Sequence, residues 1–169
     1  MGTQRYRLER VQRIAHSRDT VFAFFADAGN LELLTPDFLH FRILTPLPIV
    51  MQPGTLIDYQ LRLFSMPIRW RTRIDTYEPP IHFIDVQLLG PYRYWHHVHT
   101  FFDVPGGTLV VDRVDYELPF GCLGPLAHRL VVRRTLEQIF DYRRACLERH
   151  FVLTPSLSNG DVRDPHHYG

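Results

Sequence analysis

Apolar residues recur with a helical period near the C-terminal end of the chain. Neither glycine nor a further proline interrupts the pattern between Pro125 and Pro155, and proline is favoured at the first position of a helix. At 100° per residue, one side of residues 125–150 and the position that follows them is apolar: it carries Val132, Leu136, Ile139, Phe140, Cys146, Leu147 and Phe151. The pattern predicts one long amphipathic helix, which needs a broad apolar partner to cover that side.

Residues 55–116 alternate between apolar and polar side chains, which is the period of a half-buried β-strand. Turns rich in proline and glycine divide the region, and five strands are predicted, over residues 57–63, 68–74, 83–89, 92–103 and 108–118. Consecutive strands joined by short turns form an antiparallel meander. This meander is the predicted cover for the long helix.

The chain before the meander predicts one more strand and two short helical segments. Residues 6–14 alternate as a strand does, and we expect this strand to lie at a sheet edge or to pair with a distant strand. Ser17 is placed to cap a short amphipathic helix, and a second helical turn around Leu31 ends at Pro36. Residues 38–44 predict a short strand, and a proline-rich loop follows.

Length and composition favour one domain followed by a tail. A chain of 169 residues is long enough to bury a sizeable core or an internal cavity. We expect residues 5–152 to form this domain. Residues 153–169 are poor in apolar side chains, so we expect them to form a flexible C-terminal tail.

Charge and hydropathy exclude several classes of partner and mechanism. The net charge of +1 supplies no field to attract nucleic acid, and no apolar run approaches the roughly 18 residues that membrane insertion needs. All 19 basic residues are arginine, which excludes Schiff-base chemistry on lysine. Cys122 and Cys146 are isolated, as is typical of a reducing compartment. We therefore expect a cytoplasmic monomer or homodimer that binds no nucleic acid.

Two histidines on one strand are the first candidates for chemistry. In residues 92–103 one face carries Trp95, His97, His99 and Phe101, and its aromatic bulk favours this face as the inner one. The two histidines then sit about 6.8 Å apart on one pleat of the strand, within reach of one ligand or one metal ion. Three roles stay open: structural pairing in a wet cavity, ligand recognition, and metal binding or catalysis. Because a metal site needs further ligands that the pattern does not place, we expect neither a metal nor a cofactor.

Two charged residues lie among apolar neighbours. Arg143 falls on the apolar side of the long helix, where it can either contact a ligand or extend its guanidinium to solvent. Asp112 shares one strand face with Val114 and Tyr116. It can be an inward carboxylate, but we expect it to pair with an arginine on the next strand. The signatures of nucleophilic hydrolases, zinc proteases and P-loop proteins do not occur in the chain.

The order of strand, short helices, meander and long helix resembles the START and polyketide-cyclase-like (SRPBCC) superfamily, and in particular its bacterial ligand-binding members. The resemblance covers residues 5–151. It is carried by Asn30, Leu31, Leu34, Thr35 and Pro36; by Gly54, Ile57, Asp58 and Tyr59; by Phe83, Asp85, Gln87, Gly90, Pro91 and Tyr92; by Trp95, His97, His99 and Phe101; by Asp112, Arg113, Val114 and Tyr116; and by residues 118–142.

The resemblance implies an α+β helix-grip fold, in which a curved antiparallel sheet of six or seven strands wraps around the C-terminal helix. It also implies that Asp85 and Gln87 face inward, whereas hydrophobicity alone would turn Asp85 outward. A buried carboxylate then needs a partner, for which His97, His99 and Arg143 are the candidates.

The leading hypothesis is a cavity between sheet and helix that binds a small, largely apolar ligand such as a lipid, an aromatic compound or a polyketide. We expect it to be lined by Tyr59, Trp70, Asp85, Gln87, Trp95, His97, His99, Phe101, Asp112, Leu136, Phe140 and Arg143. The alternative is an enzyme of the polyketide aromatase/cyclase or dehydratase type, in which a histidine and an aspartate move protons. A third possibility is a structural or partner-regulating module.

Overall fold

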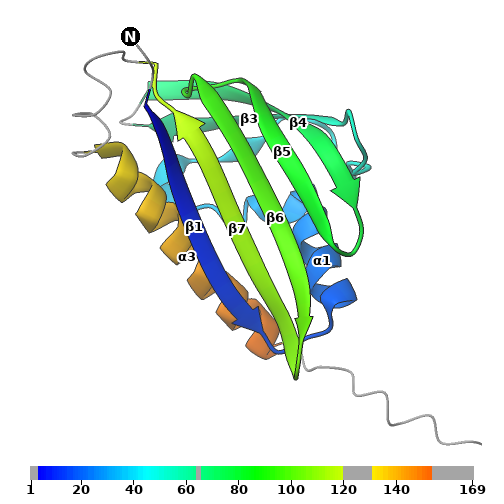
Figure 1. The fold of residues 1–169 in the computed structure, drawn as a ribbon. Coiled ribbons are helices and arrows are strands. Elements are labelled where there is room, and N and C mark those ends of the chain that lie inside the picture. Colours follow the sequence, from blue (N-terminus) through cyan, green and yellow to red (C-terminus); the bar gives the residue numbers. More distant parts are fainter. Residues whose placement is uncertain (1–3, 64–65, 120–130, 154–169) are drawn as a thin grey trace, which may run out of the picture.

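The computed structural model describes residues 4–63, 66–119 and 131–153. Its centre is one antiparallel sheet of seven strands in the order β1-β7-β6-β5-β4-β3-β2 (Figure 1). The strands are β1 (Arg5–Ile14), β2 (Arg42–Ile43), β3 (Leu56–Leu63), β4 (Met66–Glu78), β5 (His82–Leu89), β6 (Tyr94–Val104) and β7 (Gly107–Glu117). The order confirms the meander from β3 to β7, and it places the first strand beside the last one.

The helices are α1 (Arg18–Ala26), the 3-10 turns η1 (Ala28–Leu31) and η2 (Asp37–Leu39), and α3 (Arg133–Leu153). Figure 1 shows α3 running beside β1, while α1 packs against β6 and β7. Ser17 caps α1 as predicted, because its hydroxyl accepts a hydrogen bond from the Thr20 amide. This arrangement is the predicted α+β helix-grip architecture.

The strand predicted over residues 38–44 and the end of the long helix differ from the sequence prediction. The predicted strand over residues 38–44 is wrong for its first half: residues Asp37–Leu39 form η2, and only Arg42–Ile43 pair as β2. His40 has a left-handed backbone with φ of 43°, which an extended strand cannot contain. At the other end of the chain, α3 continues to Leu153, past the predicted end at His150 and into the first residue of the predicted tail. The predicted helix start at Pro125 and residues 154–169 lie outside the described residues.

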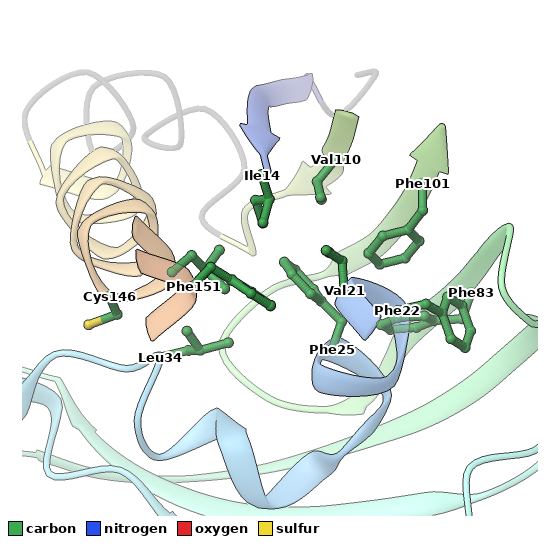
Figure 2. Packing of buried hydrophobic residues seen from close by; sticks show 11 residues of the cluster. Ile14, Val21, Phe22, Phe25, Leu34, Phe83, Phe101, Val110, Cys146 and Phe151 are labelled. Atoms are coloured by element: carbon green, nitrogen blue, oxygen red, sulfur yellow. The ribbon is translucent and has the colours of Figure 1, made fainter. Parts of the chain in front are cut away.

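A core rich in aromatic residues joins one end of α3 to α1 and the sheet (Figure 2). Phe22 and Phe25 of α1 reach Phe101 of β6 with ring centroids 5.2 Å apart in each pair, and Phe151 brings in the last turns of α3. Phe101 is 1% exposed. This packing fixes α3 across the sheet, while the part of the helix nearer Leu136 faces a separate set of apolar residues.

No helix in the described ranges is both long enough and apolar enough to cross a membrane. Cys146 is buried in α3 as a free thiol, and Cys122 lies outside the described residues.

Candidate functional site

A cavity of about 550 Å³ lies between the sheet and α3. Aliphatic and aromatic side chains form most of its wall, and they come from the sheet, from α3, and from α1 and the segment that follows it. Among the residues predicted for the site, those that line it are Tyr59, Trp70, Asp85, Trp95, His97, His99, Leu136, Phe140 and Arg143. Gln87, Phe101 and Asp112 do not line it.

Gln87 and Phe101 have structural roles instead. The Gln87 carboxamide donates to the Tyr92 carbonyl at 2.7 Å and accepts from the Tyr92 amide at 3.3 Å, so it holds the turn between β5 and β6. Phe101 belongs to the core that joins α1 to the sheet. Both residues share a strand face with cavity residues, and strand periodicity cannot distinguish them because it gives the face but not the position along it.

Four polar side chains meet on three adjacent strands beside the mainly apolar wall of the cavity. Asp85 of β5 lies opposite His97 of β6, and His99 of β6 lies opposite Asp112 of β7. Since residues two apart on a strand share a face, this register brings all four together. We call them the His–Asp cluster.

The two imidazoles of the His–Asp cluster lie between its two carboxylates. Asp85 Oδ2 is 3.2 Å from His99 Nε2 and 3.4 Å from His97 Nδ1. Asp112 Oδ1 lies behind the rings, 2.6 Å from His99 Nδ1 and 3.4 Å from His97 Nε2. The imidazole centroids are 3.8 Å apart. Asp112 therefore pairs with histidine, and the expected pairing with an arginine on the next strand is wrong.

Burial and the charges of neighbouring groups act in opposite directions on the pKa values of His99 and of the two aspartates. Burial lowers the pKa of His97, and the neighbouring His99 charge lowers it further. Burial also acts to lower the pKa of His99, but Asp112 and Asp85 outweigh it and the net pKa is raised. For both carboxylates burial opposes ionisation, yet the imidazoles keep the pKa of Asp85 and of Asp112 below the usual range. The favoured state has two carboxylates, protonated His99 and neutral His97.

Arg143 adds a positive charge from the α3 side. Its guanidinium lies 5.0 Å from the centroid of the Phe140 ring, and its charge contributes to the lowered pKa of Asp85. The buried Nε atom of Arg143 has no hydrogen-bond partner among the described residues. It is therefore available to an acceptor in the cavity.

A second polar group lies on β3 and β4. Thr72 Oγ1 is 3.1 Å from the Tyr59 hydroxyl and accepts a hydrogen bond from Trp70 Nε1 at 3.1 Å. Burial, with the charge of Asp85, raises the pKa of Tyr59, so the phenol stays neutral. Thr72 lines the cavity but was not among the predicted site residues. Its place between Trp70 and Ile74 on one strand face was the available signal.

The comparisons show the class of fold. No protein-family model matches the chain, and no curated protein matches it. Solved structures do: the Zhui aromatase/cyclase from Streptomyces sp. R1128 aligns at TM-score 0.69 and 16% identity over 88% of this chain and 94% of its own. A protein from Thermus thermophilus aligns at TM-score 0.68 and 17% identity over 90% and 100%. Norcoclaurine synthase from Thalictrum flavum aligns at TM-score 0.63 and 12% identity over 89% and 98%.

These likenesses confirm the helix-grip fold that the sequence resemblance predicted. Identities this low carry the fold alone, because one fold serves many unrelated functions. The function must therefore be argued from the cavity and the His–Asp cluster.

Proposed function

We propose that this protein binds a small, largely apolar ligand in the cavity between the sheet and α3. The observation that carries the proposal is the cavity of about 550 Å³, whose wall is mainly aliphatic and aromatic. Ligand sites of small molecules are typically about 300–1,000 Å³, mostly apolar, with a few polar groups that fix orientation. The volume suits a compound of two to four fused rings or a folded acyl chain.

The polar groups of the wall would orient the ligand. The His–Asp cluster and Arg143 offer a charged end, while Tyr59 and Thr72 offer a neutral one. A ligand with an apolar body and a carbonyl, hydroxyl or carboxylate group matches this distribution, since a buried polar group is stable only when it is paired. Lipids, aromatic compounds and polyketides meet this description.

Two structural neighbours support an aromatic member of that set. One is an aromatase/cyclase, and a Thalictrum flavum norcoclaurine synthase structure holds dopamine and hydroxybenzaldehyde. In this chain Trp70, Trp95 and Tyr92 meet in the cavity wall, with the two indoles 5.2 Å apart and perpendicular. Aromatic faces and edges of this kind favour contact with a planar ligand.

A titration with defined probes tests the proposal. Flavonoids, fatty acids and polycyclic aromatics are added to the protein while tryptophan emission and the melting temperature are recorded. Because Trp70 and Trp95 line the cavity, a bound probe should change the emission, and it should raise the melting temperature by mass action. No response to any probe would contradict the proposal.

A matched pair of variants locates the binding. Thr135 of α3 lines the cavity, so Thr135→Phe should fill part of it and weaken binding at least tenfold. Gln138→Phe adds the same side chain at an exposed position of the same helix and should bind as the wild type does. Equal binding by both variants would place the probe elsewhere.

A catalytic role of the aromatase/cyclase type is the second candidate. It rests on the His99–Asp85 hydrogen bond at the cavity wall and on two imidazoles whose pKa values are shifted apart, a pattern found at acid–base sites. Mass spectrometry of a poly-β-carbonyl probe incubated with the protein tests it. A change in the probe's mass or isomer that depends on His97 supports catalysis, whereas unchanged probe supports binding alone.

We also propose that the protein acts as a monomer or homodimer in the bacterial cytoplasm. The isolated cysteines and the free thiol of Cys146 support a reducing compartment. Size-exclusion chromatography with light scattering tests the oligomeric state.

A further inference from the structure

Three side chains of the His–Asp cluster have the chemistry and spacing of metal ligands. One potential ligand atom from each of Asp85, His97 and His99 lies within 4.8 Å of the other two. All three residues line the cavity. Two imidazoles and a carboxylate are a common ligand set for divalent transition metals, especially where coordination positions must stay open.

The spacing around Asp85 fits a shared ion. Its Oδ2 atom is 3.4 Å from His97 Nδ1 and 3.2 Å from His99 Nε2. Bonds of about 2.0–2.2 Å from a zinc ion to nitrogen and oxygen ligands place neighbouring ligands roughly 3.0–3.5 Å apart at right-angled to tetrahedral geometry. An ion could therefore lie among these three atoms after small side-chain rotations.

Asp112 lies where an outer partner of metal-bound histidines belongs. Its Oδ1 atom contacts the two ring nitrogens that face away from Asp85, His99 Nδ1 and His97 Nε2. A histidine bound to a metal through one nitrogen normally donates its other N–H to a carboxylate or carbonyl, which fixes the tautomer. One carboxylate can serve both rings here.

The buried atoms of the cluster have unmet hydrogen-bonding capacity. Despite the short separations, His97 Nε2, His99 Nδ1 and Asp112 Oδ1 are buried without a well-aligned hydrogen bond in the described part of the chain. His97 and His99 are each 5% exposed, and Asp112 is 7% exposed. A metal on the opposite nitrogens would require both outer nitrogens to carry protons and to donate toward Asp112.

The charge of the His–Asp cluster also favours a bound metal cation. Without a metal, a proton on His99 offsets part of the charge of the two aspartates. A metal ion at His99 Nε2 displaces that proton, so that both imidazoles are neutral and one divalent cation balances the two buried carboxylates. Arg143 lies nearby on α3 and its charge acts on Asp85, but its buried Nε atom has no hydrogen-bond partner among the described residues.

We propose that Asp85, His97 and His99 form a binding site for a divalent first-row transition-metal ion of the Zn²⁺ class, with Asp112 as a positioning residue. Three protein ligands leave a coordination position directed to the cavity, where a donor atom of a ligand can bind. From the sequence we expected no metal, because hydropathy does not turn Asp85 inward and therefore does not provide a third ligand. The site stands on its own geometry and does not depend on the apolar ligand.

Cobalt(II) is a suitable probe, because four- and five-coordinate Co²⁺ absorbs visible light much more strongly than six-coordinate Co²⁺ in water. Chelator-treated full-length protein is titrated with CoCl₂ and then with ZnCl₂ in competition. We expect intense d–d bands that saturate at one ion per chain and disappear when Zn²⁺ displaces Co²⁺. Wild-type protein that shows no such bands at millimolar Co²⁺ would overturn the proposal, whatever the variants do.

Variants assign the ligands. His97→Gln and His99→Gln should each abolish the bands, and Asp112→Asn should lower Zn²⁺ affinity about 10- to 100-fold, the usual effect of removing a partner that orients a metal ligand. Two controls should bind as the wild type does: His96→Gln, on the opposite face of β6, and the double variant His166→Gln/His167→Gln. Circular dichroism checks that each variant is folded.

Retention of the bands in His97→Gln/His99→Gln, or their loss in His166→Gln/His167→Gln, would show adventitious binding and overturn the site. Ligand binding by chelator-treated protein is measured separately with the aromatic and lipid probes. If those probes bind and Co²⁺ does not, only the metal proposal fails. If Co²⁺ binds and no probe does, only the apolar-ligand proposal fails.

Discussion

His97 and His99 stabilise two aspartates that would otherwise be isolated in the protein interior. Asp85 and Asp112 lie on opposite sides of the imidazole pair. A buried carboxylate without a partner costs several kcal/mol or takes up a proton. Protonated His99 has one N–H on the side of each carboxylate, so we expect the metal-free cluster to be more stable when His99 is protonated.

The pH dependence of stability should report this proton. Because Asp112 and Asp85 raise the pKa of His99 against the effect of burial, protonated His99 stabilises the folded state. This contribution is fully present below the unfolded pKa of about 6.5 and is lost as pH rises through the higher folded pKa. The titration of His97 has the opposite effect on stability, since its pKa is lowered by burial and by His99.

Asp112→Asn removes the strongest source of the raised His99 pKa. We expect the unfolding free energy of the wild type to exceed that of Asp112→Asn at pH 6, and the difference to shrink between pH 7 and pH 9. Urea unfolding in the presence of a chelator measures it, and imidazole NMR assigns the titrations. A difference that grows with pH, or a neutral His99 at pH 6, would contradict the assignment.

His97→Gln separates binding from catalysis. Under the binding hypothesis, the loss of one buried hydrogen bond to the ligand costs about 1–2 kcal/mol, a rise in Kd of about 5- to 30-fold, with less dependence on pH between 5 and 8. Under the catalytic hypothesis, the same change lowers a rate by about 100-fold or more and leaves Kd nearly unchanged. Calorimetry with a chelator present gives Kd, and His96→Gln is the control. If His97→Gln leaves Kd unchanged and the wild type has no measurable activity, His97 takes part in neither binding nor catalysis.

At the residue scale, the sequence predicted the facing of β6 correctly because aromatic bulk distinguishes its two sides. Trp95, His97 and His99 line the cavity as expected. Asp85 was placed inward only by the family resemblance, since hydropathy favours the opposite facing. The pairing of Asp112 with histidine could not be predicted, because it depends on the register between β6 and β7, which no local pattern specifies.

The strands and helices were predicted from local patterns of apolar and polar residues. The alternation in β3 to β7 marks strands that are buried on one side, and each strand was found with its ends moved by a few residues. β4 is longer than predicted and carries irregularities near Arg71 and near Ile74. Such bulges bend a strand and increase its twist, which helps the sheet to curve around α3.

Deletion of residues 154–169 tests the predicted boundary of the domain at the scale of an element. These residues carry little apolar surface, so their ordering would cost more entropy than packing returns. We expect the truncated protein to unfold within about 1 kcal/mol of the full chain in urea. A larger loss would show that the tail packs on the domain, and a loss of ligand binding alone would give it a role at the cavity.

In the described structure, the sheet and α1 pack against the C-terminal end of α3, and a cavity lies between the sheet and the rest of this helix. The aromatic core around Phe22, Phe101 and Phe151 fixes the end of α3 (Figure 2), whereas Leu136, Phe140 and Arg143 face the cavity. The order of elements was enough to predict this architecture. The cavity volume was not predictable, because it depends on how all the side chains pack together.

Native mass spectrometry of the protein purified from its own source organism tests whether the cavity holds a ligand. We predict that the wild type retains an added mass of a small organic molecule, that organic solvent releases it, and that Thr135→Phe retains much less of it than Gln138→Phe does. A wild-type protein that carries no added mass, or a mass that Thr135→Phe retains equally well, would contradict ligand binding in the cavity.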